Sequence, residues 1–68
     1  MIKLYHTGCP QCRGIEQRLK SKNIQYEEIK DINLMIERGF TTAPVIENDG
    51  HCYVGGKECS DFLRTLGA

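Results

Sequence analysis

The chain has 68 residues and nine basic against nine acidic side chains, so its formal net charge is zero. A chain of this length forms one domain, residues 1–68, with a small core. We expect no nucleic-acid partner, because lysine and arginine are not concentrated anywhere, and no membrane span, because the apolar runs are too short. No signal-peptide pattern opens the chain, and nothing indicates an obligate oligomer, so we expect a cytoplasmic monomer.

The first half of the chain reads as strand, helix, strand. Residues 1–5 alternate in a strand-like manner, and residues 24–29 form a second apolar run. Between them, Cys12, Ile15 and Leu19 are spaced i, i+3 and i+7, which predicts a helix over residues 10–22 with these three on its buried face. Strand, helix and strand within about 30 residues make a βαβ unit, so the two strands should be parallel.

The second half adds a short helix, a hairpin and a last helix. Asp31 is the expected N-cap of a helix over residues 32–38. Asp49-Gly50 predicts a tight turn between strands at residues 45–47 and 51–54, and a final helix follows Gly55-Gly56. The residues expected to face the core are Ile32, Met35 and Ile36 in the short helix and Phe62, Leu63 and Leu66 in the last one.

The resulting order is β-α-β-α-β-β-α. It predicts an α/β fold of the thioredoxin-like type, in which a four-stranded mixed sheet is flanked by helices. A C-x-x-C segment directly after the first strand of a βαβ unit is the redox pattern of such folds.

The two cysteines of that segment have different expected roles. Cys9 lies where a helix begins, and there the unpaired backbone N–H groups and the positive end of the helix dipole favour a thiolate, which is the reactive form. Pro10 suits the first helical position because it lacks an N–H. Cys12, one turn further and on the apolar face, is placed to attack a mixed disulfide formed at Cys9. The pair predicts a dithiol redox module.

Pro44 is the second signal. It opens the third predicted strand, where a missing N–H is tolerated. Together with the upstream cysteine pair, it favours a cis Ala43–Pro44 bond. The backbone of Ala43 would then be available to pair with an extended substrate, as a strand adds to a sheet edge.

Three motifs carry a resemblance to a known family. Cys9-Pro10-Gln11-Cys12, Thr41-Thr42-Ala43-Pro44 and Gly55-Gly56 resemble, in order and rough spacing, the C-P-Y-C, T-V-P and G-G segments of glutaredoxins over nearly the whole chain. The resemblance implies a thioredoxin fold, a cis-proline at Pro44, Cys9 as nucleophile and Cys12 as resolving cysteine.

The resemblance also implies a glutathione groove. His6 stands three residues before Cys9, where the family usually has lysine or arginine. In the last motif, Gly56 is followed either directly by Lys57-Glu58 or, with a two-residue insertion, by a match to the family's Cys-Ser-Asp. The groove residues that the resemblance implies are His6, Gln11, Thr42, Ala43, Pro44, Gly56, Cys59, Ser60 and Asp61.

The function expected from these features is dithiol–disulfide exchange. The substrate would be a disulfide-containing protein or a glutathione mixed disulfide, with glutathione or a reductase as electron donor, glutathione as a possible co-substrate and no tightly bound cofactor. An alternative is a resemblance to the glutaredoxin-like proteins that receive electrons from thioredoxin reductase and serve ribonucleotide reductase. Gln11 and Gly39-Phe40 are shared with that group.

Cysteine-bound metal is the main alternative from another class. Cys9, Cys12, Cys52 and Cys59 would supply four thiolates for zinc, but the second pair is spaced C-x6-C and lacks the tight zinc-knuckle spacing. A [2Fe–2S] cluster shared between two subunits is disfavoured by the proline after Cys9, so no metal ligands are expected. A non-catalytic binding module is disfavoured by the intact cysteine pair. Cys52 is expected in the core, Cys59 either lines the groove or is simply packed, and His51 should be exposed.

Overall fold

The computed structural model describes residues 2–67 and contains four strands and three helices. In chain order these are β1 (Ile2–Tyr5), α1 (Pro10–Ser21), β2 (Tyr26–Ile29), α2 (Ile32–Glu37), β3 (Val45–Asn48), β4 (His51–Val54) and α3 (Gly56–Thr65). Met1, which the sequence assigned to the first strand, lies outside the described residues.

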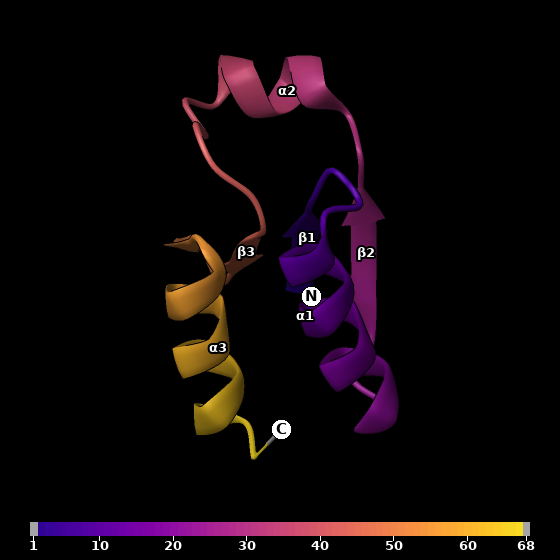
Figure 1. Ribbon diagram of the computed structural model, residues 1–68. Helices are drawn as coiled ribbons and strands as arrows, with labels where there is room; N and C mark the ends of the chain where they lie inside the picture. The colour runs from indigo at the N-terminus through magenta and orange to yellow at the C-terminus, as the bar shows by residue number, and fades with distance from the viewer. Residues whose placement is uncertain (1, 68) are drawn as a thin grey trace.

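The strands form one mixed sheet in the order β2-β1-β3-β4. β1 and β2 are parallel, as the βαβ unit requires, and β3 runs antiparallel to both of its neighbours. Helices α1 and α3 lie side by side over one face of the sheet, while α2 lies across the end at which β2 finishes (Figure 1). This arrangement confirms the predicted thioredoxin-like fold.

Two apolar clusters hold these layers together. The larger one fills the space between the sheet and the α1–α3 pair, and it includes Ile15 and Leu19 from the predicted buried face of α1. The smaller one is formed by Tyr5, Met35 and Val45, with Phe40 packed edge-on against the Tyr5 ring at a centroid distance of 5.1 Å. The smaller cluster therefore fixes α2 and the following loop to the end of the sheet.

The burial of α2 differs from the prediction. Met35 is buried, but Ile32 and Ile36 are 56% and 68% exposed. The helix has only six residues and lies across the end of the sheet, so a single side-chain row reaches the core. Leu66 is also exposed, at 45%, because α3 ends at Thr65 and the chain turns away from the core.

Other local predictions can be checked directly. The Asp31 carboxylate caps α2 by accepting from the Leu34 N–H at 3.1 Å, and the Ala43–Pro44 bond is cis. The β3–β4 hairpin is closed by Asp49 and Gly50, both with positive φ, which is the turn geometry that Asp-Gly predicted. Cys52 packs against the smaller apolar cluster but is only half-buried, because β4 is an edge strand, so the predicted core position is confirmed in part.

His51 is exposed, as expected. Within residues 2–67, none of the helices combines the length and the apolar character that a membrane crossing needs.

Candidate active site

The dithiol lies where β1 leads into α1. Cys9 is the N-cap of α1, with extended backbone angles of φ −69° and ψ 165°, and Pro10 follows as the first helical residue. The Cys9 sulfur accepts a hydrogen bond from the Cys12 N–H at 3.3 Å, and the two sulfur atoms lie 2.6 Å apart. Cys9 is partly exposed whereas Cys12 is fully buried. A substrate can therefore reach Cys9 first, with Cys12 directly behind it.

The surroundings of Cys9 favour its ionised form. The pKa of the Cys9 thiol lies below its ordinary value of 9.0, chiefly because the Cys12 side chain hydrogen-bonds to the sulfur. Desolvation acts in the opposite direction, while the backbone of Cys12, the Thr7 hydroxyl and the backbone of Gln11 add further hydrogen bonds that lower the pKa. The thiolate is the nucleophilic form of cysteine, so the fold prepares Cys9 for attack on a disulfide.

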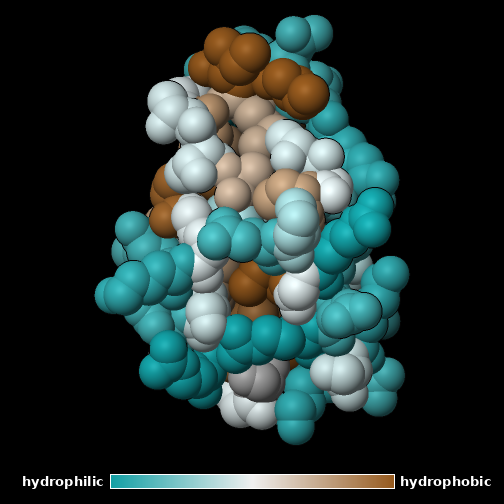
Figure 2. Space-filling view, viewed as in Figure 1, coloured by the Kyte–Doolittle hydropathy of each residue, from teal (hydrophilic) through white to brown (hydrophobic). Residues whose placement is uncertain are grey.

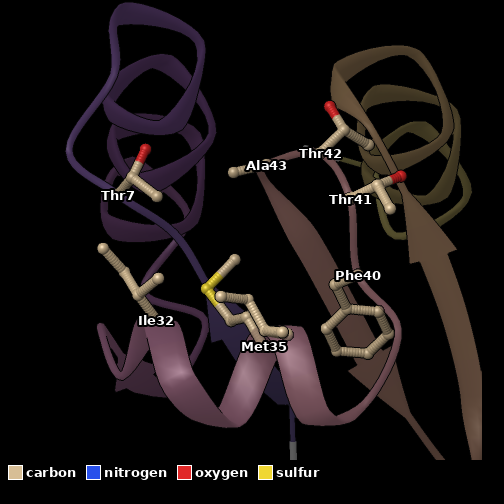
Figure 3. A pocket seen from close by; sticks show the side chains of 8 residues that line it. Thr7, Ile32, Met35, Phe40, Thr41, Thr42 and Ala43 are labelled. Atoms are coloured by element: carbon tan, nitrogen blue, oxygen red, sulfur yellow. The ribbon is translucent and has the colours of Figure 1, made fainter.

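A shallow apolar groove of about 210 Å³ begins two residues before Cys9 and runs to α2. In Figure 2 the hydrophobic side chains of this face gather at the α2 end around a hollow, while hydrophilic side chains cover much of the two long helices. Figure 3 shows Thr7 and Ala43 on opposite sides of the groove, with Ile32, Met35 and Phe40 at the α2 end. The exposed isoleucines of α2 thus belong to a surface next to the dithiol.

The turn around Pro44 supplies the other wall of this groove. Thr42 and Ala43 line it, whereas Pro44 is buried. The Pro44 carbonyl accepts from the Gly55 N–H at 2.9 Å, which ties the turn to the start of α3. Within residues 2–67, the backbone N–H and C=O of Ala43 make no hydrogen bond, so both are available to a substrate backbone.

The residues expected at the start of α3 have other partners. The Gln11 side chain lies against Gly56, where a Cβ would be only 3.0 Å from its Oε1 atom. Ser60 accepts a hydrogen bond from Arg18 at 2.7 Å. Asp61 forms ion pairs with Arg64 at 2.8 Å and with Lys57 at 3.9 Å. None of these side chains lines the groove between Thr7 and Ala43, but Gln11, Gly56 and Ser60 line a neighbouring hollow of about 230 Å³.

Cys59 is packed and does not line the groove. Its thiol is fully buried, and its one S–H hydrogen is shared between the carbonyl oxygens of Pro44 and Tyr53, at 3.4 and 3.3 Å. Burial raises the pKa of this thiol to about 12. The structure thus decides between the two alternatives that the sequence left open. All four cysteines are free thiols, and no three of them lie close enough to share a metal ion.

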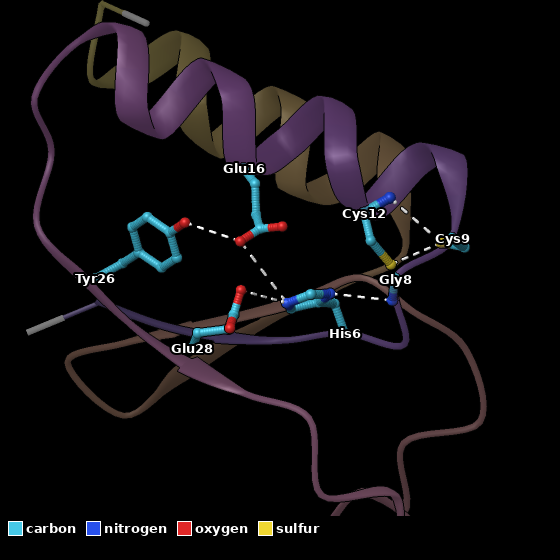
Figure 4. A network of polar contacts seen from close by, with 7 residues as sticks. All are labelled: His6, Gly8, Cys9, Cys12, Glu16, Tyr26 and Glu28. Atoms are coloured by element: carbon cyan, nitrogen blue, oxygen red, sulfur yellow. Dashed lines mark hydrogen bonds and ion pairs between the residues drawn. The ribbon is translucent and has the colours of Figure 1, made fainter.

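His6 is placed in the interior, behind the dithiol (Figure 4). The residue is 1% exposed, and its Nδ1 atom accepts a hydrogen bond from the Gly8 N–H at 3.1 Å. Its Nε2 atom lies 3.0 Å from an oxygen of Glu28 and 3.9 Å from one of Glu16. His6 was expected among the groove residues, but its ring does not line the groove.

Sequence reasoning missed the acidic partners of His6. Tyr26 donates to the Glu16 carboxylate at 2.9 Å, and burial, followed by this contact, raises the pKa of Tyr26 to about 12. The pKa of Glu28 is lowered, first by contact with Glu16 and then by His6. Glu28 lies beside the buried Leu4 in the sheet. The signal that could have revealed this cluster was Glu28, an acidic residue that the pairing of the two parallel strands places next to a buried leucine.

Comparisons with known proteins complete the description. No protein-family model matches the chain. It is 28% identical to a thioredoxin of Methanothermobacter thermautotrophicus over 65 residues, which cover 87% of this chain and 84% of the relative. It is 38% identical over 63 residues to an uncharacterized glutaredoxin-like 8.6 kDa protein in the rubredoxin operon of Clostridium pasteurianum, with 81% of this chain and 84% of the relative covered.

Proposed function

Since this chain belongs to the glutaredoxin-like proteins of the thioredoxin family, we propose that it reduces protein disulfides through Cys9 and Cys12. The observation that carries the proposal is the asymmetry of the two thiols. Cys9 is accessible at the N-terminus of α1 and has a lowered pKa, whereas Cys12 is buried against it. One thiol is suited to attack a substrate and the other to resolve the product.

The reaction has two exchange steps. The Cys9 thiolate attacks one sulfur of the substrate disulfide, a Cys9–substrate disulfide forms, and the other substrate sulfur leaves as a thiolate that takes up a proton. Cys12 then loses its proton and attacks the Cys9 sulfur, and the second substrate sulfur leaves in the same way. Two electrons have passed to the substrate, and the Cys9–Cys12 disulfide must be reduced by an external thiol donor.

The groove favours a polypeptide over glutathione as substrate. An extended chain can pair with the free N–H and C=O of Ala43, as in strand addition, and place an apolar side chain between Ile32 and Met35. Two of the side chains expected to hold glutathione have other partners, Ser60 with Arg18 and Asp61 with Arg64, and His6 is buried beside Glu28.

The same contacts favour a reductase protein of the thioredoxin reductase type as electron donor, in place of glutathione. As its target we propose a protein disulfide such as that of ribonucleotide reductase. A dithiol donor must be kept reduced, and thiols stay reduced in the cytosol, so we propose that the reaction takes place there.

The test is NADPH consumption with a disulfide-containing protein as substrate, run with two donor systems. One contains thioredoxin reductase alone, and the other contains glutathione with glutathione reductase. We expect turnover with the first and at least tenfold less with the second, and Cys9→Ser should be inactive in both. Turnover with glutathione alone would overturn the donor assignment, and activity of Cys9→Ser would overturn the dithiol mechanism.

A further inference from the structure

Three side chains of metal-ligating type converge behind the dithiol from three different elements. His6 follows β1, Glu16 lies on α1 and Glu28 on β2 (Figure 4). One ligand atom from each lies within 4.8 Å of those of the other two. We propose that His6, Glu16 and Glu28 form a binding site for a divalent transition-metal ion such as Zn²⁺. The inference does not depend on the redox activity proposed above.

The distances suit a single ion. Bonds of 2.0–2.2 Å in a tetrahedral zinc site place neighbouring ligand atoms about 3.4 Å apart. The His6 Nε2 atom lies 3.0 Å from Glu28 and 3.9 Å from Glu16, so the observed separations fall on either side of this value. A bonded geometry would require these two separations to change by about 0.4 and 0.5 Å.

The buried nitrogen of His6 is an independent sign of a missing ligand. Within residues 2–67, Nε2 is buried and makes no hydrogen bond, although oxygen atoms of Glu28 and Glu16 lie 3.0 and 3.9 Å away. Buried polar atoms of this kind nearly always have a partner. Two carboxylates thus lie close to this nitrogen without forming a hydrogen bond with it, as they would around a shared ion.

The charge and exposure of the cluster also suit a cation. Two carboxylates close together repel each other unless a proton or a cation lies between them. One imidazole nitrogen and two carboxylates form a ligand set that zinc accepts. The Glu28 side chain is 42% exposed, which provides a path for the ion and for water ligands. Tyr26 donates to the Glu16 carboxylate, the type of outer contact that orients metal ligands.

Metal binding at this site is linked to the loop that carries Cys9. Because Nδ1 accepts from the Gly8 N–H, a neutral His6 ring holds its proton on Nε2. To bind a metal ion through Nε2, that proton must move to Nδ1, and the Gly8 hydrogen bond is then lost. Losing one such bond weakens metal affinity by roughly fivefold. Metal binding and the Gly8 contact therefore exclude each other, and Gly8 immediately precedes Cys9.

The test is a calorimetric titration of the oxidised protein with Zn²⁺, since a Cys9–Cys12 disulfide removes the dithiol as a competing zinc ligand. We expect one ion per chain in the wild type, with affinity at least tenfold lower in Glu28→Gln and Glu16→Gln. Both substitutions keep the side-chain shape, and circular dichroism checks the fold. Glu27→Gln is the matched control, because Glu27 has the same charge on the same strand but points to the opposite face of the sheet.

A second measurement follows the Gly8 amide by NMR. Zinc should shift this resonance and speed its hydrogen exchange in the wild type and in Cys52→Ser, but not in Glu28→Gln. The site is refuted if the oxidised wild type takes up no zinc, if both glutamine variants bind it with unchanged affinity, or if binding is lost in Cys52→Ser instead. Zinc binding that depends on Glu28 but leaves the Gly8 amide unchanged would overturn the link to the Cys9 loop.

Discussion

The thiol of Cys59 donates a hydrogen bond to the carbonyl oxygen of Pro44, with the sulfur and the oxygen 3.4 Å apart. The same oxygen accepts the Gly55 N–H at 2.9 Å. These two contacts join the start of α3 to the turn that forms one wall of the groove. The position of that wall therefore depends on Cys59 and Gly55, which do not line the groove themselves.

Cys59 should make the stability of the reduced protein fall at high pH. Its pKa in the folded state is raised from 9.0 to about 12, so the thiol ionises in the unfolded chain first. The contribution of this thiol to the free energy of unfolding is fully present below pH 9. It is lost as the pH rises from about 9 toward 12, by up to about 1.4 kcal/mol per pH unit. Urea unfolding between pH 8 and 10.5 measures this slope. Cys59→Ala should flatten it, and an equal slope in the variant would contradict the assignment.

Substitution by alanine should change the stability of the protein in opposite directions at Gly55 and Gly14. Gly55 has φ 91° and ψ 162°, a conformation that is essentially restricted to glycine, so Gly55→Ala should destabilise the protein by about 1–3 kcal/mol. Gly14 lies inside α1 with open space around it, so Gly14→Ala should stabilise it by about 0.5–1 kcal/mol. The denaturant concentrations at the unfolding midpoints of the two variants measure these changes. An equal loss of stability in both variants would refute the argument from backbone conformation.

Serine variants of the two active-site cysteines should block the reaction at different steps. Cys9→Ser removes the accessible nucleophile and should reduce turnover to background. Cys12→Ser keeps the first exchange but cannot resolve it, so a Cys9–substrate adduct should accumulate and be visible by intact mass spectrometry. Cys52→Ser is the control and should turn over normally. A stable adduct on Cys12 in the Cys9→Ser variant would show that the roles are reversed.

The pH dependence of Cys9 alkylation should reveal the contribution of Cys12. The rate of reaction with iodoacetamide follows the thiolate fraction, so the lowered pKa of Cys9 should place the midpoint below pH 9.0. Cys12→Ala removes the largest cause of the lowering and should move the midpoint to higher pH, while the backbone hydrogen bonds remain. If the midpoint is unchanged in Cys12→Ala, the lowering of the Cys9 pKa comes from the start of the helix alone.

The exposed isoleucines of α2 should matter for protein substrates only. Ile32 and Ile36 contribute little to the core, so replacing both by serine should change the free energy of unfolding by less than about 0.5 kcal/mol. We expect kcat/KM to fall roughly five- to tenfold for a protein disulfide and to stay unchanged for a small one. Leu66→Ser is the control, because Leu66 is an exposed residue that follows α3, and the C-terminal end of α3 lies away from α2 (Figure 1). An equal fall for both substrates would argue against a docking role.

Sequence alone determined the features that depend on neighbours along the chain. The spacing of Cys12, Ile15 and Leu19 defined the buried face of α1, and Asp49-Gly50 defined the hairpin turn. Cys9 could be placed at a helix start because the preceding strand and the following proline are local signals. Periodicity and turn chemistry act over a few residues, so they can be read without knowing what packs against them.

Tertiary structure decided everything that required knowing what lies opposite a side chain. Periodicity placed Ile32 and Ile36 on one side of a helix, but only the position of α2 at the end of the sheet showed that nothing within residues 2–67 covers them. The meeting of His6 with Glu28 depends on the parallel pairing of β1 with β2. Burial and charge pairing are properties of surfaces brought together by folding, and no local pattern in the chain encodes which surfaces meet.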